Sequence, residues 1–192
     1  MINIELLEIS GIRSALNALR LPFGKECRSE VKDEYIGWAN EPEIINFNSS
    51  VHIDINPKDL LLMSTLVKRG DEHAKVVRGI IAYAEITAPV YWWCEMECYR
   101  AGHERLCSES TMHTDCRGLT GDELVNAKSE IPMGRMLKKI DYFSYQCLRT
   151  IVKQRHNHRL PEWHSFIEWI KTLPFADELI LKGIDSTHDD DN

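Results

Sequence analysis

Hydrophobic residues recur at helical spacing in several separate stretches of the chain, and most of these stretches have a residue that marks a boundary. One stretch opens at Asn56 and Pro57 and ends at Gly70, because Asn caps free backbone amides and Pro is tolerated at the first helical position. The pattern predicts helices over Ile12–Leu21, between Pro57 and Gly70, and over Glu162–Leu173.

The longest periodic stretch is Met133–Arg155, where apolar residues repeat at three and four positions and basic residues lie largely opposite. It predicts a core helix of about six turns. The runs Val51–Ile55 and Gly79–Thr87 predict strands. Between these elements, Tyr91–Ala101 predicts a buried helix and Gly102–Cys116 predicts the loop that follows it.

The composition is that of an ordinary globular protein, with 43% hydrophobic and 28% charged residues among 192. No linker divides the chain, so we expect one α/β domain over residues 1–184 and a disordered acidic tail over residues 185–192. No apolar run approaches the roughly 18 residues of a membrane span, and no secretory signal opens the chain. The protein is therefore expected in the cytoplasm, with its six cysteines reduced.

A net charge of −7 argues against nucleic-acid binding, because phosphate contacts along a nucleic acid need a basic surface. Four aspartates of the tail carry much of that charge. The body of the chain is only mildly acidic, so its net charge does not exclude a basic pocket that binds a small anion.

The stretch Tyr91–His113 is the densest in chemically capable side chains. It combines Trp, Tyr, Cys, His, Arg and hydroxyl residues with no Pro and a single Gly. Aromatic and Cys side chains prefer burial while Arg, His and Glu resist it, so the mixture indicates the lining of a pocket.

Two kinds of chemistry are possible there besides anion binding. A zinc site needs four soft or borderline ligands, and the stretch with its next residues supplies Cys94, Cys98, His103, Cys107, His113 and Cys116, though without a CxxC or HExxH pattern. Nucleophilic catalysis is the other, with Cys107, Ser108 or Ser110 near His103 or His113. No GxSxG motif accompanies them, and we expect no metal.

Arginines form two islands flanked by aromatic residues. Arg100 and Arg105 make the first, and Arg155 and Arg159 make the second with His158 between them. Arginine offers a planar, permanently charged fork for phosphate, and aromatic faces stack on flat rings. The islands together favour a phosphate-bearing ligand. Arg13 and Arg20, seven positions apart on the first helix, are further candidates for the edge of an anion pocket.

The order of these elements from about Leu60 to Trp169 resembles the flavin-dependent (alternative) thymidylate synthases. Their motif R-H-R-x-x-S-x-N-E-x-S-x-R-Y can be laid on the chain in two registers. Started at Arg100, it matches Arg100 and Ser110; started at His103, it matches Arg105 and Ser108. Asn-Glu and the closing Arg-Tyr are absent in both registers. The motif is therefore degenerate.

The resemblance implies a mostly antiparallel sheet packed by long helices, assembled as a homotetramer. It implies reductive methylation of a pyrimidine nucleotide such as dUMP, with methylenetetrahydrofolate as carbon donor and NADPH reducing FAD. By the same resemblance, FAD would contact Arg100 and the Gly70–His73 segment through Glu72 and His73. The nucleotide would contact Arg100, Arg105, Ser108, Ser110, Arg155 and Arg159.

The degenerate motif leaves a second function open. Each lost motif arginine removes charge-assisted hydrogen bonds worth roughly 1.5–3 kcal/mol. A chain with such losses can keep the fold and a nucleotide pocket while catalysis is lost, so the alternative is a non-catalytic nucleotide-binding protein of the same fold.

Overall fold

The computed structural model describes residues 2–25 and 55–184 of the chain. Within them, strands β1 (Asn3–Ser10), β2 (Ile81–Pro89), β3 (His103–Ser108) and β4 (Met136–Ser144) form one sheet. The strand order is β1-β2-β4-β3, and every neighbouring pair is antiparallel. The predicted α/β class with an antiparallel sheet is confirmed.

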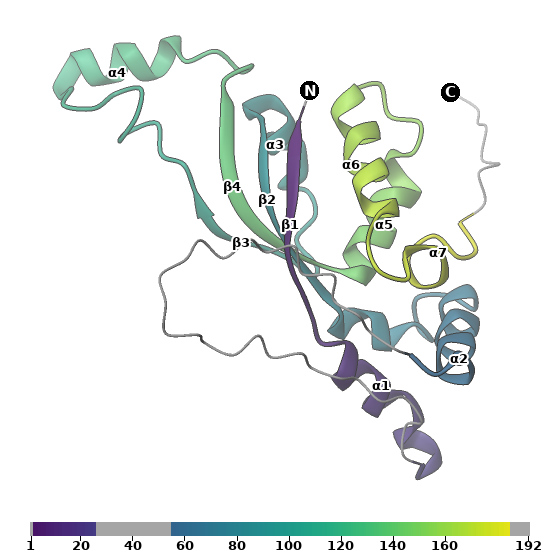
Figure 1. Ribbon diagram of the computed structural model, residues 1–192. Coiled ribbons are helices and arrows are strands. Elements are labelled where there is room, and N and C mark those ends of the chain that lie inside the picture. Colours follow the sequence, from purple (N-terminus) through teal and green to yellow (C-terminus); the bar gives the residue numbers. More distant parts are fainter. Residues whose placement is uncertain (1, 26–54, 185–192) are drawn as a thin grey trace, which may run out of the picture.

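Helices α5 and α6 lie on one side of the sheet, α1 and α2 lie beyond one end of it, and α4 stands far from the rest (Figure 1). The longest helix of the described chain, α2, has 12 residues, so the helices are shorter than expected. No helix in these two segments is both long and apolar enough to cross a membrane. The helix bounds are α1 (Ile12–Arg20), α2 (Pro57–Lys68), α3 (Val90–Met96), α4 (Gly121–Glu130), α5 (Tyr145–Arg155), α6 (Pro161–Lys171) and α7 (Ala176–Leu179), with 3-10 turns at Leu21–Phe23 and Lys75–Gly79.

Three of the predicted helices are confirmed as α1, α2 and α6, with small changes of boundary. The start of α2 follows from its sequence, because the Asn56 Oδ1 accepts a hydrogen bond from the Lys58 backbone amide at 3.0 Å. The strand predicted at Gly79–Thr87 is confirmed as β2, with both ends shifted by two residues towards the C-terminus. The strand expected at Val51–Ile55 falls largely outside the described residues, as does the acidic tail at 185–192.

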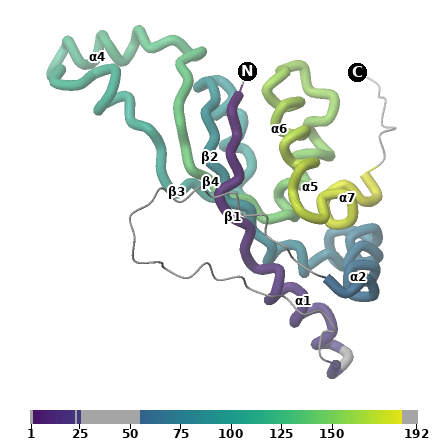
Figure 2. The backbone as a smooth tube through the Cα atoms, viewed as in Figure 1, coloured from purple at the N-terminus to yellow at the C-terminus, as the bar shows by residue number. Residues whose placement is uncertain are grey.

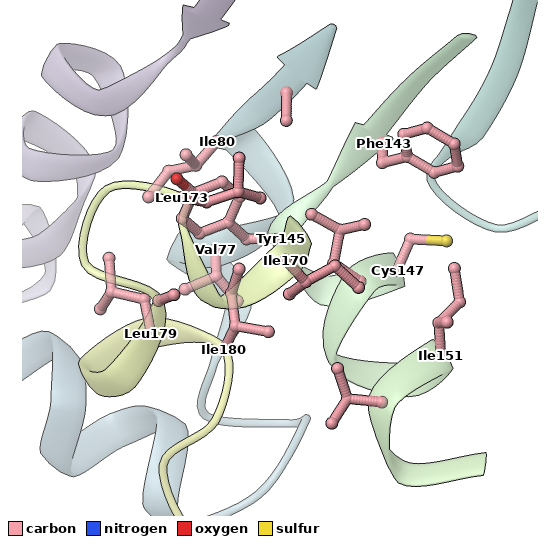
Figure 3. Packing of buried hydrophobic residues seen from close by; sticks show 14 of the residues in the cluster. Val77, Ile80, Phe143, Tyr145, Cys147, Ile151, Ile170, Leu173, Leu179 and Ile180 are labelled. Atoms are coloured by element: carbon pink, nitrogen blue, oxygen red, sulfur yellow. The ribbon is translucent and has the colours of Figure 1, made fainter. Parts of the chain in front are cut away.

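The core forms where the strands turn alternate residues towards the helices. Ala82, Ala84 and Ile86 of β2 are fully buried, while the residues between them are partly exposed. Trp92 of α3 packs against Trp163 of α6, with ring centroids 5.0 Å apart. Figure 3 shows the neighbouring part of the core, where side chains of β4, α5, α6 and α7 meet. Aromatic packing therefore fixes α3 and α6 against one another.

The prediction of one long helix over Met133–Arg155 is wrong. The stretch contains β4 and then α5, and Ser144 is both the last residue of β4 and the N-cap of α5. The Ser144 Oγ accepts a hydrogen bond from the Cys147 amide at 3.1 Å and so begins α5. In β4 the buried positions include Lys139 and Asp141, so the strand's inward face is charged and its alternation is hidden from a hydrophobic pattern.

Two further predictions need correction. The helix expected at Tyr91–Ala101 ends at Met96, and the loop expected at Gly102–Cys116 contains strand β3. Only His103 of β3 is buried, so this edge strand has little hydrophobic alternation to reveal it. The sequence analysis also missed β1 and α4. Helix α4 contains no buried residue, which leaves no apolar face to detect.

The connection between β3 and β4 leaves the body as a single arm that carries α4 (Figure 2). Arg135 braces the base of this arm. Its Nε lies 2.9 Å from the Asp115 Oδ1, and one terminal nitrogen lies 3.0 Å from the Glu109 Oε1. The hydrogen bond from Arg135 lowers the pKa of Asp115 to about 2. The two sides of the arm are therefore tied together where they join the sheet.

Candidate functional site

Charged side chains meet on the face of the sheet that the helices cover. Asp141 of β4 is fully buried and lies directly opposite Arg105 of β3. Its Oδ2 lies 2.7 Å from the His103 Nε2, and its Oδ1 accepts from the Arg105 Nε at 3.3 Å. Arg105 pairs at its other end with the Glu97 Oε1, at 2.5 Å. Asp141 is thus neutralised from two sides.

Two hydrogen bonds and one ring contact hold His103 in position. Its Nδ1 lies 2.8 Å from the Tyr99 carbonyl oxygen, and its Nε2 faces the Asp141 carboxylate. The carbonyl can only accept, so the His103 Nδ1 donates to it, and the Nε2 shares a proton with the Asp141 carboxyl group. The ring stacks on Phe143 at a centroid distance of 4.6 Å. The hydrogen bonds and this stacking fix the orientation of the His103 ring.

Lys139 enters the same region from β4, two residues before Asp141. It is only 9% exposed, and its Nζ lies 4.4 Å from the centroid of the Trp93 ring. Trp93 is held by a hydrogen bond of 3.1 Å from its Nε1 to the Leu137 carbonyl. Burial, and next the nearby Arg105 guanidinium, lower the pKa of Lys139. No carboxylate of the described chain forms an ion pair with it.

A second cluster surrounds Glu95 of α3. Its Oε2 accepts a hydrogen bond from the Trp163 Nε1 at 2.8 Å and pairs with Arg155 at 3.3 Å. The His158 Nε2 lies 3.4 Å from the same oxygen. The Arg155 Nε also donates to the Tyr99 hydroxyl at 2.8 Å, and burial is the main cause that raises the pKa of Tyr99. Arg155 is therefore held between Glu95, Tyr99 and the Trp163 ring.

The structure brings the two arginines of the first island together. The Arg100 Nε donates to the backbone carbonyl of Glu97 at 3.4 Å, while Arg105 pairs with the carboxylate of the same residue. Arg100 is exposed to solvent, and Arg105 is partly buried. The turn between α3 and β3 therefore gathers both candidate phosphate ligands, with Arg155 reaching Tyr99 next to them.

The predicted serines lie on the other end of β3. Ser108 is exposed and is the cross-strand partner of Lys139, so the two residues share one face of the sheet. Its hydroxyl donates to the Glu109 carbonyl at 2.9 Å. Ser110 lies at the base of the arm, where its carbonyl accepts a hydrogen bond from Thr114. Ser108 is thus the serine that lies beside the buried charges.

The remaining predicted site residues lie apart from this cluster. His73 and Glu72 follow α2 and pair with one another at 3.6 Å, with half of the His73 side chain exposed. Arg159 is exposed after α5. Arg20 forms a hydrogen bond of 2.6 Å to the buried Asp59, which joins α1 to α2. The Arg20 guanidinium therefore pairs with a carboxylate of the chain and links the two helices.

The geometry gives little support to the two alternative chemistries, a zinc site and nucleophilic catalysis. Within the described residues, no three His, Cys, Asp or Glu side chains converge as a metal site would require. His103, a candidate base for a nucleophile, has both ring nitrogens engaged by Tyr99 and Asp141. Cys107 is exposed, and its thiol approaches only the Ser108 carbonyl in the described chain. Residues 2–25 and 55–184 thus contain no cluster of three such ligands.

The sequence analysis missed the acidic and lysine members of the site. Asp141, Lys139, Glu97 and Glu95 were not singled out. A signal was present, because Lys139, Asp141 and Phe143 alternate with half-buried residues, as one face of a strand does. A reading of this segment at period two would have put both charged residues on the buried face.

No family model and no curated protein matches the chain. Solved structures do match. Thymidylate synthase X (ThyX) from Helicobacter pylori, solved with FAD and dUMP, superposes with a TM-score of 0.65 at 10% identity, over 96% of this chain and 99% of that one. The UMP/dUMP methylase PolB from Streptomyces cacaoi, bound with 5-Br dUMP, superposes with a TM-score of 0.60 at 12% identity, over 97% of each chain. At such identities the likeness concerns the fold. The chain has the fold of the flavin-dependent thymidylate synthases.

Proposed function

We propose that the chain binds a pyrimidine nucleotide such as dUMP and methylates it reductively, with reduced FAD and methylenetetrahydrofolate, as a divergent relative of the flavin-dependent thymidylate synthases. The fold supports the proposal, because the structures that share it were solved with such nucleotides. The observation that carries it is the convergence of Arg100 and Arg105 on Glu97, beside the buried charges of β4.

The nucleotide phosphate is assigned to Arg100, with Arg105 behind it. Arg100 is exposed and engages only the Glu97 carbonyl within the described chain, so its terminal nitrogens remain available for a bidentate contact. Arg105 adds positive charge while Glu97 and Asp141 fix its position. Ser108, Ser110, Arg155 and Arg159 complete the proposed nucleotide contacts.

FAD is assigned to Arg100, Glu72 and His73. The exposed Arg100 guanidinium is available for a phosphate and His73 is half exposed, and because these residues lie apart in one protomer, the assignment requires that they meet across two subunits. When bound, reduced flavin supplies the hydride, and NADPH is the proposed source of that reduction. The chain itself orients the two phosphate-bearing molecules and offsets their charge, at a homotetramer interface in the cytoplasm.

The second candidate is a nucleotide-binding protein of the same fold without catalysis. One observation favours it: Arg105 and Arg155 are both engaged by carboxylates of the chain itself. Guanidinium groups held in this way contribute less to phosphate binding, because a ligand must compete with their internal partners.

The visible absorption spectrum separates the two candidates. The enzyme predicts that purified protein mixed with FAD retains flavin bands after gel filtration, and that it then converts dUMP to the methylated nucleotide. Protein that stays colourless while dUMP still binds by calorimetry would support the non-catalytic candidate and contradict the flavin enzyme.

Both candidates predict that Arg100→Ala weakens dUMP binding about tenfold or more, because a charge-assisted contact to phosphate is lost. The matched control is Arg69→Ala, which removes an exposed arginine at the end of α2. Equal dUMP affinity of the wild type and the Arg100 variant would contradict the assignment of the phosphate to Arg100.

A further inference from the structure

The sheet has one face packed against helices and one face that is not. Helices α5 and α6 lie on the packed side, where Ala82, Ala84 and Ile86 of β2 are fully buried (Figure 1). The residues between them point the opposite way, and Tyr83 and Glu85 are only partly buried. This second surface, which we call the open face, is therefore available to another molecule. It includes Glu5, Glu8, Tyr83, Glu85, Glu104 and Tyr142.

A row of four residues crosses the open face, one from each strand. Glu8 of β1 lies opposite Tyr83 of β2, and Tyr83 lies opposite Tyr142 of β4. Glu104 of β3 is the other cross-strand partner of Tyr142. The two tyrosine rings are in contact, with their centroids 5.6 Å apart, and both glutamates are exposed. The row therefore has an aromatic centre and a carboxylate at each end.

The open face carries more negative charge than the described chain neutralises. Glu5 and Glu85 lie directly opposite one another, a placement that is unfavourable for like charges. Lys138 offsets part of this repulsion through its ion pair with Glu85 at 2.5 Å. Glu5, Glu8 and Glu104 form no ion pair within residues 2–25 and 55–184. A cationic partner would compensate this excess of carboxylates.

These charges favour a partner other than a second copy of the chain. Two copies that met through the open face would bring their glutamates together, because a twofold contact uses the same patch on both subunits. The arm, residues 109–135, contains five acidic and three basic residues, and the whole chain has a net charge of −7, so neither complements the face. A guanidinium group does, since it stacks on aromatic rings and forms paired hydrogen bonds with carboxylates.

We propose that the open face docks an arginine-bearing segment of another protein, with one arginine on Glu8 and Tyr83 and a second on Glu104 and Tyr142. Strands β1 and β3 are three strand spacings apart, about 14 Å. Arginines four positions apart in an extended segment lie about 13 Å from one another and on the same side. The surface lies on the opposite face of the sheet from the buried Asp141, so it is independent of the proposed function.

The spacing is tested with labelled peptides and the full chain by fluorescence anisotropy. The probe is Arg-Ser-Gly-Ser-Arg-Ser-Gly-Ser-Arg, which has arginine at every fourth position. It is expected to bind at least about fivefold more tightly than Arg-Arg-Arg-Ser-Gly-Ser-Ser-Gly-Ser, which has the same composition and charge. Equal affinities would mean that net charge alone attracts the peptides, and this result, or no binding of the probe, would overturn the proposal.

Variants locate the contact. Glu8→Gln combined with Glu104→Gln is expected to weaken binding of the probe about tenfold, because both ends of the row lose a charged acceptor. The matched control, Glu123→Gln with Glu130→Gln, removes the same charge from exposed positions of α4 and should leave the affinity within about twofold. Tyr142→Leu should lower the affinity about threefold, whereas Tyr142→Phe keeps the ring and the affinity. An equal loss in the two double variants would overturn the proposal.

Two further measurements test the other occupants of the open face. In light scattering, the wild type and the variant that lacks both Glu8 and Glu104 are expected to have the same mass. A different mass would make the open face a contact between copies and overturn the proposed partner. Spermine, a cation without guanidinium groups, is expected not to displace the probe at equal concentration. Displacement would identify a free polyamine as the ligand and would also overturn the proposal.

Discussion

Asp141 holds three segments of the chain together through one carboxylate. It joins β4 to His103 and Arg105 of β3. His103 in turn forms a hydrogen bond with the Tyr99 carbonyl, which follows α3. Because the Asp141 carboxylate is buried and pairs with the Arg105 guanidinium, no neutral side chain would be an equal substitute for it. Loss of that one charge should therefore be felt in stability before it is felt in any binding.

Asp141→Asn is expected to lower the free energy of unfolding by about 3 kcal/mol, since it leaves His103 and Arg105 without their shared anion. Urea denaturation followed by tryptophan fluorescence measures this loss. The control is Glu123→Gln in α4, an exposed position where a change of less than about 0.5 kcal/mol is expected. An Asp141 variant as stable as the control would mean that the buried ion pairs contribute nothing net.

At the scale of elements, the junction between β3 and α5 depends on a residue without a side chain. Gly102 has a φ of 79°, and a Cβ there would collide with the side chain of Ser144. Ser144 caps α5, and its own amide donates to the Gly102 carbonyl at 2.7 Å. Glycine is therefore required twice, by the positive φ and by the close approach.

Gly102→Ala is expected to cost about 2 kcal/mol or more of unfolding free energy, from the left-handed backbone and the displaced cap together. Gly134→Ala is the matched control, because no atom lies within 4 Å of the Cβ it would add. That control is expected to be neutral or slightly stabilising. The same denaturation experiment measures both variants, and equal stability of the two would show that the backbone relaxes freely at Gly102.

The sequence predicted elements where hydrophobic residues mark a face, and failed where charges occupy it. α2 and α6 were found because caps and apolar periodicity agree. The hydrophobic pattern predicts a helix where β4 lies, because Lys139 and Asp141 replace apolar residues on the buried face of the strand. The arginines of the site could be named from their chemistry, whereas their partners Glu95, Glu97 and Asp141 could not. Pairing across strands depends on register, which one sequence does not encode locally.

For the molecule as a whole, the arm between β3 and β4 is the part that lacks packing against the rest of the described chain. Its helix α4 has no buried residue, and Met112, Val125 and Met133 are each more than 40% exposed. A helix of ten residues is marginal in water without tertiary contacts. The arm therefore supports the proposed assembly with further copies of the chain, which would cover it.

Val125→Asp is expected to shift the protein towards smaller species in light scattering coupled to gel filtration, while the thermal transition of the protomer is kept. The reason is that a buried charge opposes packing of α4 against another copy. Leu61→Asp on α2, where Leu61 is 68% exposed, is the control and is expected to leave the size unchanged. A Val125 variant of unaltered mass would remove α4 from the proposed interface.

The strand order also determines when the sheet can form during translation. β1 is made first but pairs with β2, whose other neighbour β4 ends at residue 144. As the chain emerges from the ribosome, the four-stranded sheet cannot be completed until β4 has been translated, so the apolar residues of β1 lack part of their core until then. Such non-local pairing slows folding and lengthens exposure to aggregation. Nascent chains that end before β4 should therefore be the forms that rely most on chaperones.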